Sequence, residues 1–274
     1  MPPLPPDLPA ADGGASAAMG DLARGLAAAL DGNLLGLYVH GSLVAGDFSP
    51  ARSDLDLLAV LRNAPDEAVL AAVAPVHEWV ESRHPAWRGR VEVETVGVPT
   101  LVAFGAVSSA ATSGRRELIM RVSPGEALHL LPATTHRILT WATVREKGRP
   151  IVGPPAAELL PPIAPGAVRT ALLEHVRDWP VWVEDMTTVG AQAYAVLSMC
   201  RAWCALVEGE QRSKKAAANR FAPAHPGDAE LVVWARDWWY AGGSDEARSR
   251  FGEVQDFVVR ASRSLLDGSS PTPP

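Results

Sequence analysis

The sequence predicts an N-terminal α/β domain followed by an all-α helical bundle. Between residues 17 and 96, short apolar runs alternate with helical patterns, which is typical of an α/β unit. After residue 165, apolar residues recur every three or four positions without any strand pattern, which is typical of a helical bundle. Six prolines lie between residues 150 and 165. Because proline removes a backbone donor and restricts the residue before it, we expect the two domains to meet there.

The elements of the first domain each have their own signal. Helices are expected over 17–30, where leucine recurs every fourth residue, and over 65–83, which opens with proline and two acidic residues. Strands are expected over the apolar runs 34–40 and 55–61, and over 90–96, where charged residues alternate with valine.

The second domain is expected to contain helices only. Each carries apolar residues at helical spacing, and the predicted ranges are 168–186, 191–207, 213–221, 229–240 and 247–265.

The complete organisation predicted from the sequence has four parts. Both ends of the chain are rich in Pro, Gly, Ala or Ser and lack apolar periodicity, so we expect tails there. The predicted ranges are a tail over 1–15, an α/β domain over 16–153, a helical domain over 154–267 and a tail over 268–274.

The composition excludes several classes of protein. The 274 residues include 25 Lys+Arg and 31 Asp+Glu, a formal net charge of −6, whereas a general nucleic-acid-binding protein needs a basic surface. No apolar run reaches the length of about 18 residues that a membrane-spanning helix needs, and the N-terminus lacks the features of a signal peptide. We therefore expect a cytoplasmic protein with reduced cysteines, no membrane association and no obligatory protein partner.

The clearest chemical signal follows the first expected strand. This strand ends in Gly41-Ser42, and after a turn-rich stretch the next strand opens with Ser53-Asp54-x-Asp56. Gly41 allows a close approach of the backbone to a ligand, and a helix beginning at Ser42 has free N–H groups that bind anions. Asp54 and Asp56 are two residues apart, so on a strand both side chains point to one face.

Two adjacent carboxylates repel each other unless a cation lies between them. Hard oxygen ligands beside a phosphate cradle suit Mg²⁺, so the segment indicates metal-dependent phosphoryl or nucleotidyl transfer. The alternative is an aspartate-rich turn that caps a strand and a helix. The ordered combination of Gly-Ser, Ser53 and the aspartate pair between two apolar strands favours the catalytic interpretation.

This arrangement resembles the nucleotidyltransferase superfamily, which has the DNA polymerase β-like fold and a Gly-Ser…Asp-x-Asp signature. The resemblance implies that the first domain is an α+β nucleotidyltransferase domain. It also implies ATP as co-substrate and two Mg²⁺ ions held by Asp54, Asp56 and a third carboxylate.

Two glutamates on the expected strand 90–96 are candidates for the third carboxylate. Glu92 and Glu94 project to the same face of that strand. Arg90-Val91-Glu92-Val93 resembles the segment in which aminoglycoside adenylyltransferases keep a glutamate proposed as general base. The resemblance favours Glu92 as both base and metal ligand, with Glu94 as the alternative.

The C-terminal half resembles the helical domain of streptomycin/spectinomycin adenylyltransferases. The segments that carry this resemblance are 194–203 and 213–217. In that family an Arg and a Lys at the positions of Arg201 and Lys214 grip the ATP triphosphate across the domain cleft. The alternatives are a helix-surface arginine and a first-turn surface lysine, although a cation in the first turn opposes the helix dipole.

The expected acceptor site is an acidic and aromatic helical face. Trp182 matches an aromatic drug contact of the family, and Asp178 and Asp185 share its predicted helix, with Pro180 expected to kink that helix. Such a face suits a polycationic aminoglycoside, but a solvated face with a core tryptophan fits the pattern equally well.

Two positions depart from the family pattern at the acceptor. Ala127 follows Gly-Glu where the family has a tryptophan that stacks on the drug. Ala191 stands near the family's acidic drug contact.

Taken together, the residues and the resemblance imply an ATP- and Mg²⁺-dependent O-adenylyltransferase. AMP would pass to a hydroxyl of an aminoglycoside antibiotic of the streptomycin/spectinomycin type. Two alternatives remain: transfer to another small hydroxylated metabolite, and a non-catalytic nucleotide-binding module.

Overall fold

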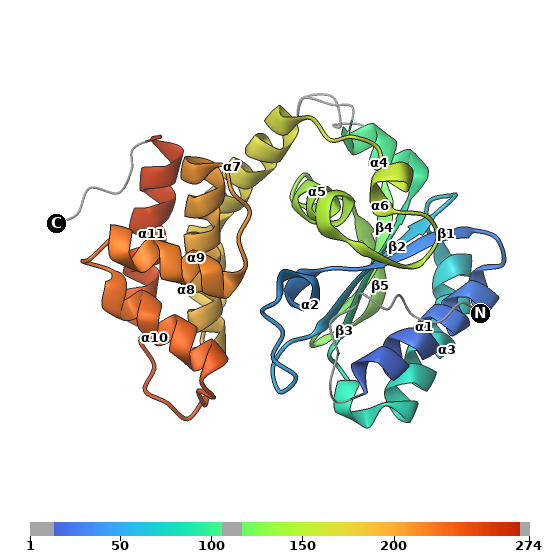
Figure 1. Cartoon of the computed structure of the whole chain (residues 1–274), viewed down its shortest axis with the longest axis horizontal. Coiled ribbons are helices and arrows are strands. Elements are labelled where there is room, and N and C mark those ends of the chain that lie inside the picture. Colours follow the sequence, from blue (N-terminus) through green and yellow to red (C-terminus); the bar gives the residue numbers. More distant parts are fainter. Residues whose placement is uncertain (1–13, 106–116, 269–274) are drawn as a thin grey trace. The chain divides into compact units, whose positions relative to one another are not determined.

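The computed structural model describes residues 14–105 and 117–268. The chain divides into two compact units, Met1–Val168 and Arg169–Pro274, called unit 1 and unit 2 (Figure 1). The predicted tails lie outside the described residues, except that the first helix already begins at Ala15 and residue 268 belongs to a turn.

Unit 1 is built on one mixed sheet of six strands in the order β5-β4-β3-β2-β1-β6. Strands β2 and β3 pair in parallel, and the other neighbours pair antiparallel. The strands are β1 Leu34–Val39, β2 Leu55–Leu61, β3 Val91–Gly97, β4 Leu118–Ser123, β5 Glu126–Pro132 and β6 Arg149–Val152.

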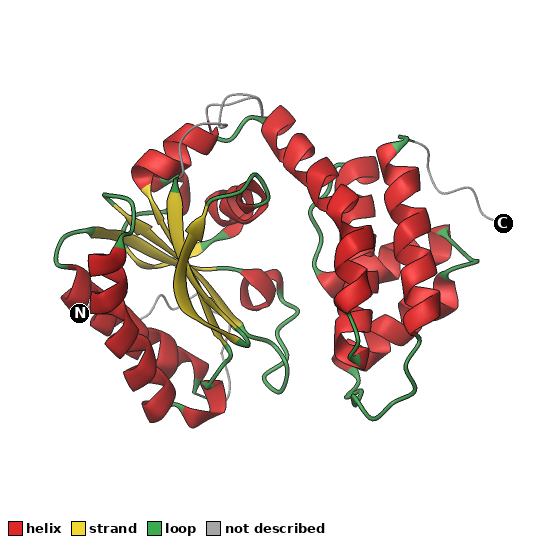
Figure 2. Cartoon of the chain, turned by 180° about the vertical axis from the view of Figure 1, so that it is seen from behind, coloured by secondary structure: helices red, strands yellow, loops and turns green. Residues whose placement is uncertain are grey.

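The helices of unit 1 lie on both faces of this sheet. They are α1 Ala15–Leu30, α2 Gly41–Ala45, α3 Glu67–Arg83, α4 Val98–Gly105, α5 Arg137–Lys147 and α6 Ala156–Leu159, with a short 3₁₀ turn at Pro85–Trp87. Helices α1 and α3 cover one face and α5 lies on the other (Figures 1 and 2). This mixed sheet with helices confirms the predicted α+β fold class.

Alternation along the two central strands separates an apolar face from a polar one. Leu57 on β2 and Val93 on β3 belong to the apolar core beneath α1 and α3. Their neighbours in sequence point to the opposite face of the sheet, because successive side chains of a strand alternate. The acidic residues of β2 and β3 therefore lie on the side of α5.

Helices α1 and α3 are joined by a buried charge as well as by apolar packing. Asp21 is 4% exposed, and its carboxylate accepts contacts at 2.8 Å from both Arg83 Nε and His84 Nε2. A buried carboxylate needs such partners, so this cluster fixes the two helices against each other.

Several boundaries of the first domain differ from those predicted. Helix α3 begins at Glu67, not at residue 65, because Asp66 is the N-cap and its side chain accepts from Val69 N at 2.9 Å. The strands and helices of unit 1 that the sequence did not predict are β4, β5, β6, α4, α5 and α6.

The predicted domain boundary after residue 153 is wrong in the structure. Residues 154–160 pack on unit 1: Tyr38 Oη donates to the carbonyl of Pro154 at 2.9 Å, and Leu160 is 2% exposed. The prolines do not separate the units, because the short helix α6 packs back against β1 and α5.

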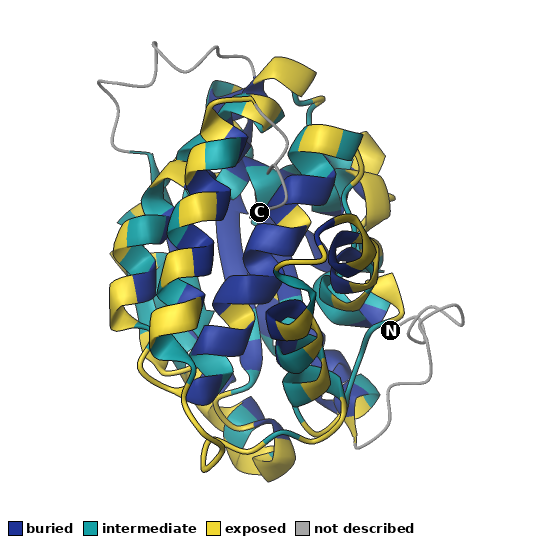
Figure 3. Ribbon diagram, turned by 90° about the vertical axis from the view of Figure 1, so that its left-hand side faces the viewer, coloured by how far each residue is buried: buried dark blue, intermediate teal, exposed yellow. Residues whose placement is uncertain are grey.

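Unit 2 is a bundle of helices around the central helix α8, which contacts α9, α10 and α11. The helices are α7 Pro165–Trp182, α8 Val189–Trp203, α9 Lys214–Ala224, α10 Ala229–Tyr240 and α11 Phe251–Leu266, with a 3₁₀ turn at Val183–Asp185 and a π-helical turn at Cys204–Glu208. Buried and exposed stripes alternate around the helices (Figure 3). Helix α7 continues through Pro180 to Trp182, beyond the point where we expected a kink.

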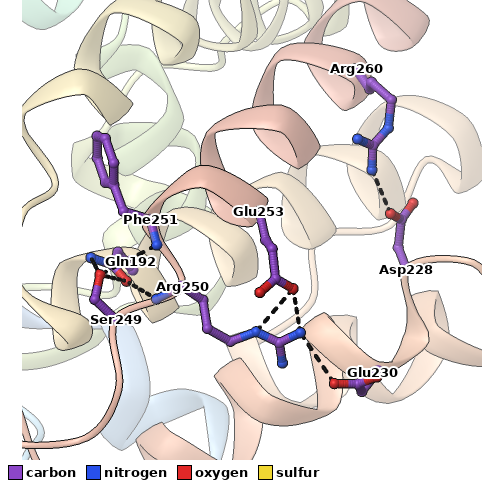
Figure 4. A network of polar contacts seen from close by, with 8 residues as sticks. All are labelled: Gln192, Asp228, Glu230, Ser249, Arg250, Phe251, Glu253 and Arg260. Carbon is purple, nitrogen blue, oxygen red and sulfur yellow. Dashed lines mark hydrogen bonds and ion pairs between the residues drawn. The ribbon is translucent and has the colours of Figure 1, made fainter.

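A buried glutamine holds the connection between α10 and α11 against α8 (Figure 4). Gln192 is fully buried; its Nε2 donates to Ser249 Oγ at 2.9 Å, and its Oε1 accepts from Arg250 N at 2.9 Å. Arg250, the residue before the last helix, has a backbone conformation that is not helical (φ −113°, ψ 29°). The last helix therefore begins at Phe251, four residues after the predicted start.

Among the described residues, no helix is both long enough and apolar enough to cross a membrane.

Candidate active site

The register of β2 and β3 brings two acidic side chains together. Asp56 on β2 pairs with Glu92 on β3 in the parallel ladder, so both side chains lie on the same face at neighbouring positions. Asp54 lies just before β2 and not within it, which corrects the prediction that both aspartates are on the strand. Its side chain is 35% exposed, with Arg90 Nε 4.0 Å from its Oδ1.

Gly41 is packed directly against Asp56. Its φ is +66°, and a Cβ atom at this position would collide with the Asp56 carboxylate. The backbone N–H of His40 donates to the Asp56 carbonyl at 2.9 Å. Glycine is therefore required here both by the left-handed conformation and by the space that the carboxylate occupies.

A short helix separates Gly41 from the aspartates. Helix α2 contains Gly41 and Ser42 in its first turn and ends at Gly46, whose φ is +75° and whose N–H donates to the Ser42 carbonyl. Ser53 is 5% exposed, and its Oγ accepts from Ser49 N at 2.9 Å. Ser53 therefore stabilises the loop before β2. Its contact with ATP remains a prediction.

The surroundings of Glu92 affect its protonation. Burial raises the pKa of Glu92, and the neighbouring Asp56 raises it further, while Arg121, His40 and Arg137 oppose both effects. Burial also lowers the pKa of His40 to about 4. The Ser123 hydroxyl lies 3.4 Å from Glu92 Oε2 and donates to it.

Glu94 has a different environment although it points to the same face. It is 3% exposed, Arg137 Nη1 donates to its Oε2 at 3.1 Å, and Trp141 Nε1 donates to its Oε1 at 2.5 Å. Both of its oxygens are thus occupied by residues of α5. Glu92, and not Glu94, is the glutamate beside Asp56.

The donor set on this face fits Mg²⁺. Burial raises the pKa of Glu92 most, and repulsion from the carboxylate of Asp56 at the adjacent register position adds to it; a divalent cation relieves that repulsion. Within residues 14–105 and 117–268, no three His, Cys, Asp or Glu side chains are gathered closely enough to hold a metal by themselves. Mg²⁺ is commonly held by one or two carboxylates together with substrate phosphates, so a substrate would have to supply the remaining ligands.

Sequence reasoning missed the polar residues that surround these acids. Ser123 and Arg121 belong to β4, and Arg137 begins α5, neither of which was predicted. The available signal was the charge at Arg121 and Arg137 beside apolar residues, but only the β3–β4 pairing brings Arg121 near Glu92, and only the packing of α5 on the sheet brings Arg137 there.

The two predicted phosphate-binding cations both belong to unit 2. Arg201 is exposed on α8, and its Nε donates to the Arg212 carbonyl at 3.2 Å. Lys214 is the first residue of α9, and its Nζ lies 4.1 Å from the ring centroid of Trp239 and 4.9 Å from that of Tyr194.

The predicted acceptor residues are spread over the end of α7. The ring of Trp182 packs against His175 and Trp179, with centroids 5.2 Å and 5.7 Å away, so it contributes to the apolar core of unit 2. Asp178 is half-buried on α7, and Asp185 is exposed on the following 3₁₀ turn. Both interpretations of Trp182 made from the sequence, core residue and ligand contact, are compatible with this position.

Comparisons with known proteins agree over most of the chain. A family model for the C-terminal domain of aminoglycoside adenylyltransferase matches residues 158–264. Relatives from Klebsiella pneumoniae and Shigella flexneri, each described as aminoglycoside (3'')(9) adenylyltransferase, are 27% identical over 239 residues, which is 84% of this chain and 86% of theirs. A relative of the same description from Escherichia coli is 27% identical over 240 residues, with the same two coverages.

A solved structure shares the fold. The spectinomycin adenyltransferase of Enterococcus faecialis, solved with ATP and spectinomycin, superposes with a TM-score of 0.70 at 16% identity and covers 90% of this chain and 98% of its own. With the family model and the curated relatives, this similarity extends over both units. The chain is thus similar to aminoglycoside adenylyltransferases over 84% of its length, and these similarities identify it as a nucleotidyltransferase.

Proposed function

We propose that this protein transfers AMP from ATP to a hydroxyl group of an aminoglycoside antibiotic of the streptomycin/spectinomycin type. The observation that carries the proposal is the pairing of Asp56 with Glu92, beside a glycine whose missing side chain makes room for the Asp56 carboxylate. The curated aminoglycoside adenylyltransferases, which match 84% of the chain, support adenylyl transfer as its chemistry.

Glu92 is the proposed general base. It takes the proton from the acceptor hydroxyl as the oxygen attacks the α-phosphorus of ATP. The bond from that phosphorus to the bridging oxygen breaks, and pyrophosphate leaves. The raised pKa of Glu92 supports this role, because a base whose pKa lies nearer to neutrality accepts a proton more readily.

The remaining phosphate contacts in this proposal are made by backbone N–H groups and by two cations. Backbone N–H groups at Gly41 and Ser42 bind the terminal phosphates, with Ser53 at the edge of the same loop. Arg201 and Lys214 neutralise the charge that builds up on the departing pyrophosphate.

Asp54, Asp56 and Glu92 are the residues that would hold two Mg²⁺ ions. When bound, the ions neutralise triphosphate charge and stabilise the negative charge that develops at the α-phosphorus. Asp54 is partly exposed, so substrate phosphates can supply further ligands beside it.

The acceptor is proposed to bind through Trp182, Asp178 and Asp185. A polycationic drug suits a face with two acids and an aromatic ring. One observation favours a second candidate, another small hydroxylated metabolite: Ala127 is exposed on β5 and Ala191 lies in the first turn of α8, so neither position supplies a drug contact. Either reaction would take place in the cytoplasm, where ATP is available.

Mass spectrometry tests the proposed reaction directly. The purified protein is incubated with ATP, Mg²⁺ and a panel of aminoglycosides, and the drugs are examined for an added AMP group. We expect adenylylation of streptomycin or spectinomycin by the wild-type protein and none by Asp56→Asn. Unmodified drugs, together with AMP transfer to a hydroxylated metabolite, would replace the first candidate with the second.

Activity without any Mg²⁺ requirement would contradict the metal assignment. Chelation by EDTA should abolish turnover, and added Mg²⁺ should restore it. If Asp56→Asn unfolds the protein, the aspartate acts as a structural cap, which thermal unfolding would reveal.

A further inference from the structure

Lys214 lies on an aromatic surface made by two other helices. Its Nζ is 4.1 Å from the ring centroid of Trp239 on α10 and 4.9 Å from that of Tyr194 on α8. The two ring centroids are 6.2 Å apart, with an angle of 40° between their planes. Three helices of unit 2 therefore meet at one ammonium group.

The position of Lys214 in its own helix does not explain this contact. Lys214 begins α9, directly after the N-cap Ser213, whose side chain accepts from Ala216 N at 3.2 Å. A cation in the first turn opposes the helix dipole, so α9 by itself disfavours a lysine here. The ring faces carry partial negative charge and offset that cost.

The two rings are themselves fixed by further packing. Tyr194 lies 5.9 Å from the ring of Trp179, and Trp239 lies 5.8 Å from that of Trp238. Trp238 is in turn anchored, because its Nε1 donates to the Ser244 carbonyl at 3.0 Å. The surface beneath the ammonium is therefore held rigidly by the bundle.

We infer that Tyr194 and Trp239 are positioning residues that hold the Lys214 ammonium ready for the ATP triphosphate. This inference rests on the proposed function, in which Lys214 binds phosphate. An ammonium carries three N–H donors, and phosphate oxygens accept from such donors. A free lysine has many rotamers, and a side chain that is already confined loses less entropy when the phosphate binds.

The neighbouring lysine provides a matched control. Lys215 Nζ lies 5.5 Å from the ring centroid of Tyr240, which is the same kind of contact between the same two helices. Nothing in the proposed function uses Lys215. Tyr240→Leu therefore removes from α10 a ring that contacts Lys215.

ATP binding by the full-length protein, measured by calorimetry with Mg²⁺, tests the inference. We expect Trp239→Leu to weaken ATP binding roughly 3–10-fold, Tyr194→Leu to weaken it by a similar or smaller factor, and Tyr240→Leu to leave it unchanged. Trp239→Phe keeps an aromatic face and should restore most of the affinity. In turnover assays the KM for ATP should rise while kcat changes little.

A double-mutant cycle separates positioning from a general loss of structure. In the Lys214→Met background, Trp239→Leu should cause no further loss of ATP affinity, because the residue through which it acts is absent. Additive losses, or an equal loss in Tyr240→Leu, would overturn the inference.

The same variants test the phosphate-binding role of Lys214 and its positioning by the two rings separately. If Lys214→Met itself leaves ATP binding unchanged, the phosphate-binding role of Lys214 in the proposed function is wrong. If Lys214→Met weakens binding but neither ring substitution does, the proposed function stands and the aromatic positioning is wrong. If Trp239→Leu lowers thermal stability, Trp239→Phe serves as the control, because it keeps an aromatic ring at this position.

Discussion

Glu92 and Glu94 show how residues of the same type on one face of a strand acquire different tasks. Glu94 is enclosed by α5, with Arg137 and Trp141 donating to its two oxygens. Glu92 lies two residues earlier, beside Asp56. Glu94 therefore has a structural role, whereas Glu92 lies beside a second carboxylate whose charge a cation can neutralise.

Substitution of each glutamate should therefore have a distinct effect. We expect Glu92→Gln to lower kcat by about 10²–10⁴ with little change in ATP affinity, as for loss of a general base. Glu94→Gln should instead destabilise the fold by roughly 1–3 kcal/mol, because it removes the charge that Arg137 pairs with. Steady-state kinetics and thermal unfolding of both variants separate the two effects.

The reverse pattern would exchange the assignments. If Glu94→Gln is stable but inactive while Glu92→Gln turns over normally, Glu94 is the base. Both variants carry the same Glu→Gln change at different positions, so their kinetics and stabilities can be compared directly.

His77 gives unit 1 a pH dependence of its stability. It is 8% exposed on α3, and burial lowers its pKa to about 4, below the ordinary value of 6.5. The folded state therefore favours the neutral ring. This stability is fully present above pH 6.5 and is lost as the pH falls toward 4, by roughly 1.4 kcal/mol per pH unit.

Denaturant unfolding at several pH values checks this prediction. The stability of the wild-type protein should fall between pH 6.5 and 4 more steeply than that of His77→Leu, which lacks the titrating ring. Other groups titrate in both proteins, so the quantity to compare is the difference between the two slopes. Parallel curves would show that His77 does not contribute.

Among the elements, the short helix α2 depends on a glycine at each end. Gly41 and Gly46 both have a positive φ, +66° and +75°, so any other residue is strained at either position. Only Gly41 faces a neighbour: a Cβ there would strike Asp56, whereas a Cβ at Gly46 would meet nothing within 4 Å.

This pair allows backbone strain to be separated from the requirements of the site. Both Gly41→Ala and Gly46→Ala should lose about 1 kcal/mol of stability from the unfavourable φ. Gly41→Ala should in addition lower turnover by at least about tenfold, because Asp56 must move. Equal turnover in the two variants would mean that the Gly41 contact does not position the carboxylate.

The unpredicted strands have a physical cause in common. Strands β4 and β5 lie at one side of the sheet and are mostly half-buried or exposed, so they lack the clear alternation of apolar residues seen in β3. Helix α5 differs from them, because it buries Ile138, Trp141 and Val144 at helical spacing, a pattern that the sequence analysis missed. Sequence periodicity records burial in an apolar core, and half-buried strands at the side of a sheet carry too little of it to be recognised.

At the scale of the whole molecule, the proposed function predicts an order of substrate binding. The helical unit carries the proposed ATP ligands Arg201 and Lys214 as well as the proposed acceptor residues. We therefore expect aminoglycoside binding to require ATP and Mg²⁺ first. The alanines at positions 127 and 191 remove two contacts worth about 1–2 kcal/mol each, so affinity should be roughly 30–1000-fold below that of a complete site.

Calorimetry of streptomycin and spectinomycin checks this order of binding. We expect heat on titration into the ATP–Mg²⁺ complex of a catalytically inactive variant such as Glu92→Gln, and none into the protein alone. Equal binding in both states would contradict the required order. No heat with either drug would favour the second candidate acceptor.

The sequence alone determined the central architecture: β2 was predicted with its exact ends, as was α10, and the Gly-Ser and aspartate motif was correctly located between two strands. These features are local, because periodicity, turn chemistry and short spacing depend only on residues that are close together in the sequence. Only the tertiary structure decided that Glu92 and not Glu94 lies beside Asp56, that residues 154–160 belong to unit 1, and that Lys214 rests on Tyr194 and Trp239. Each of these depends on strand register or on packing between distant segments, and no local pattern in the chain encodes such pairings.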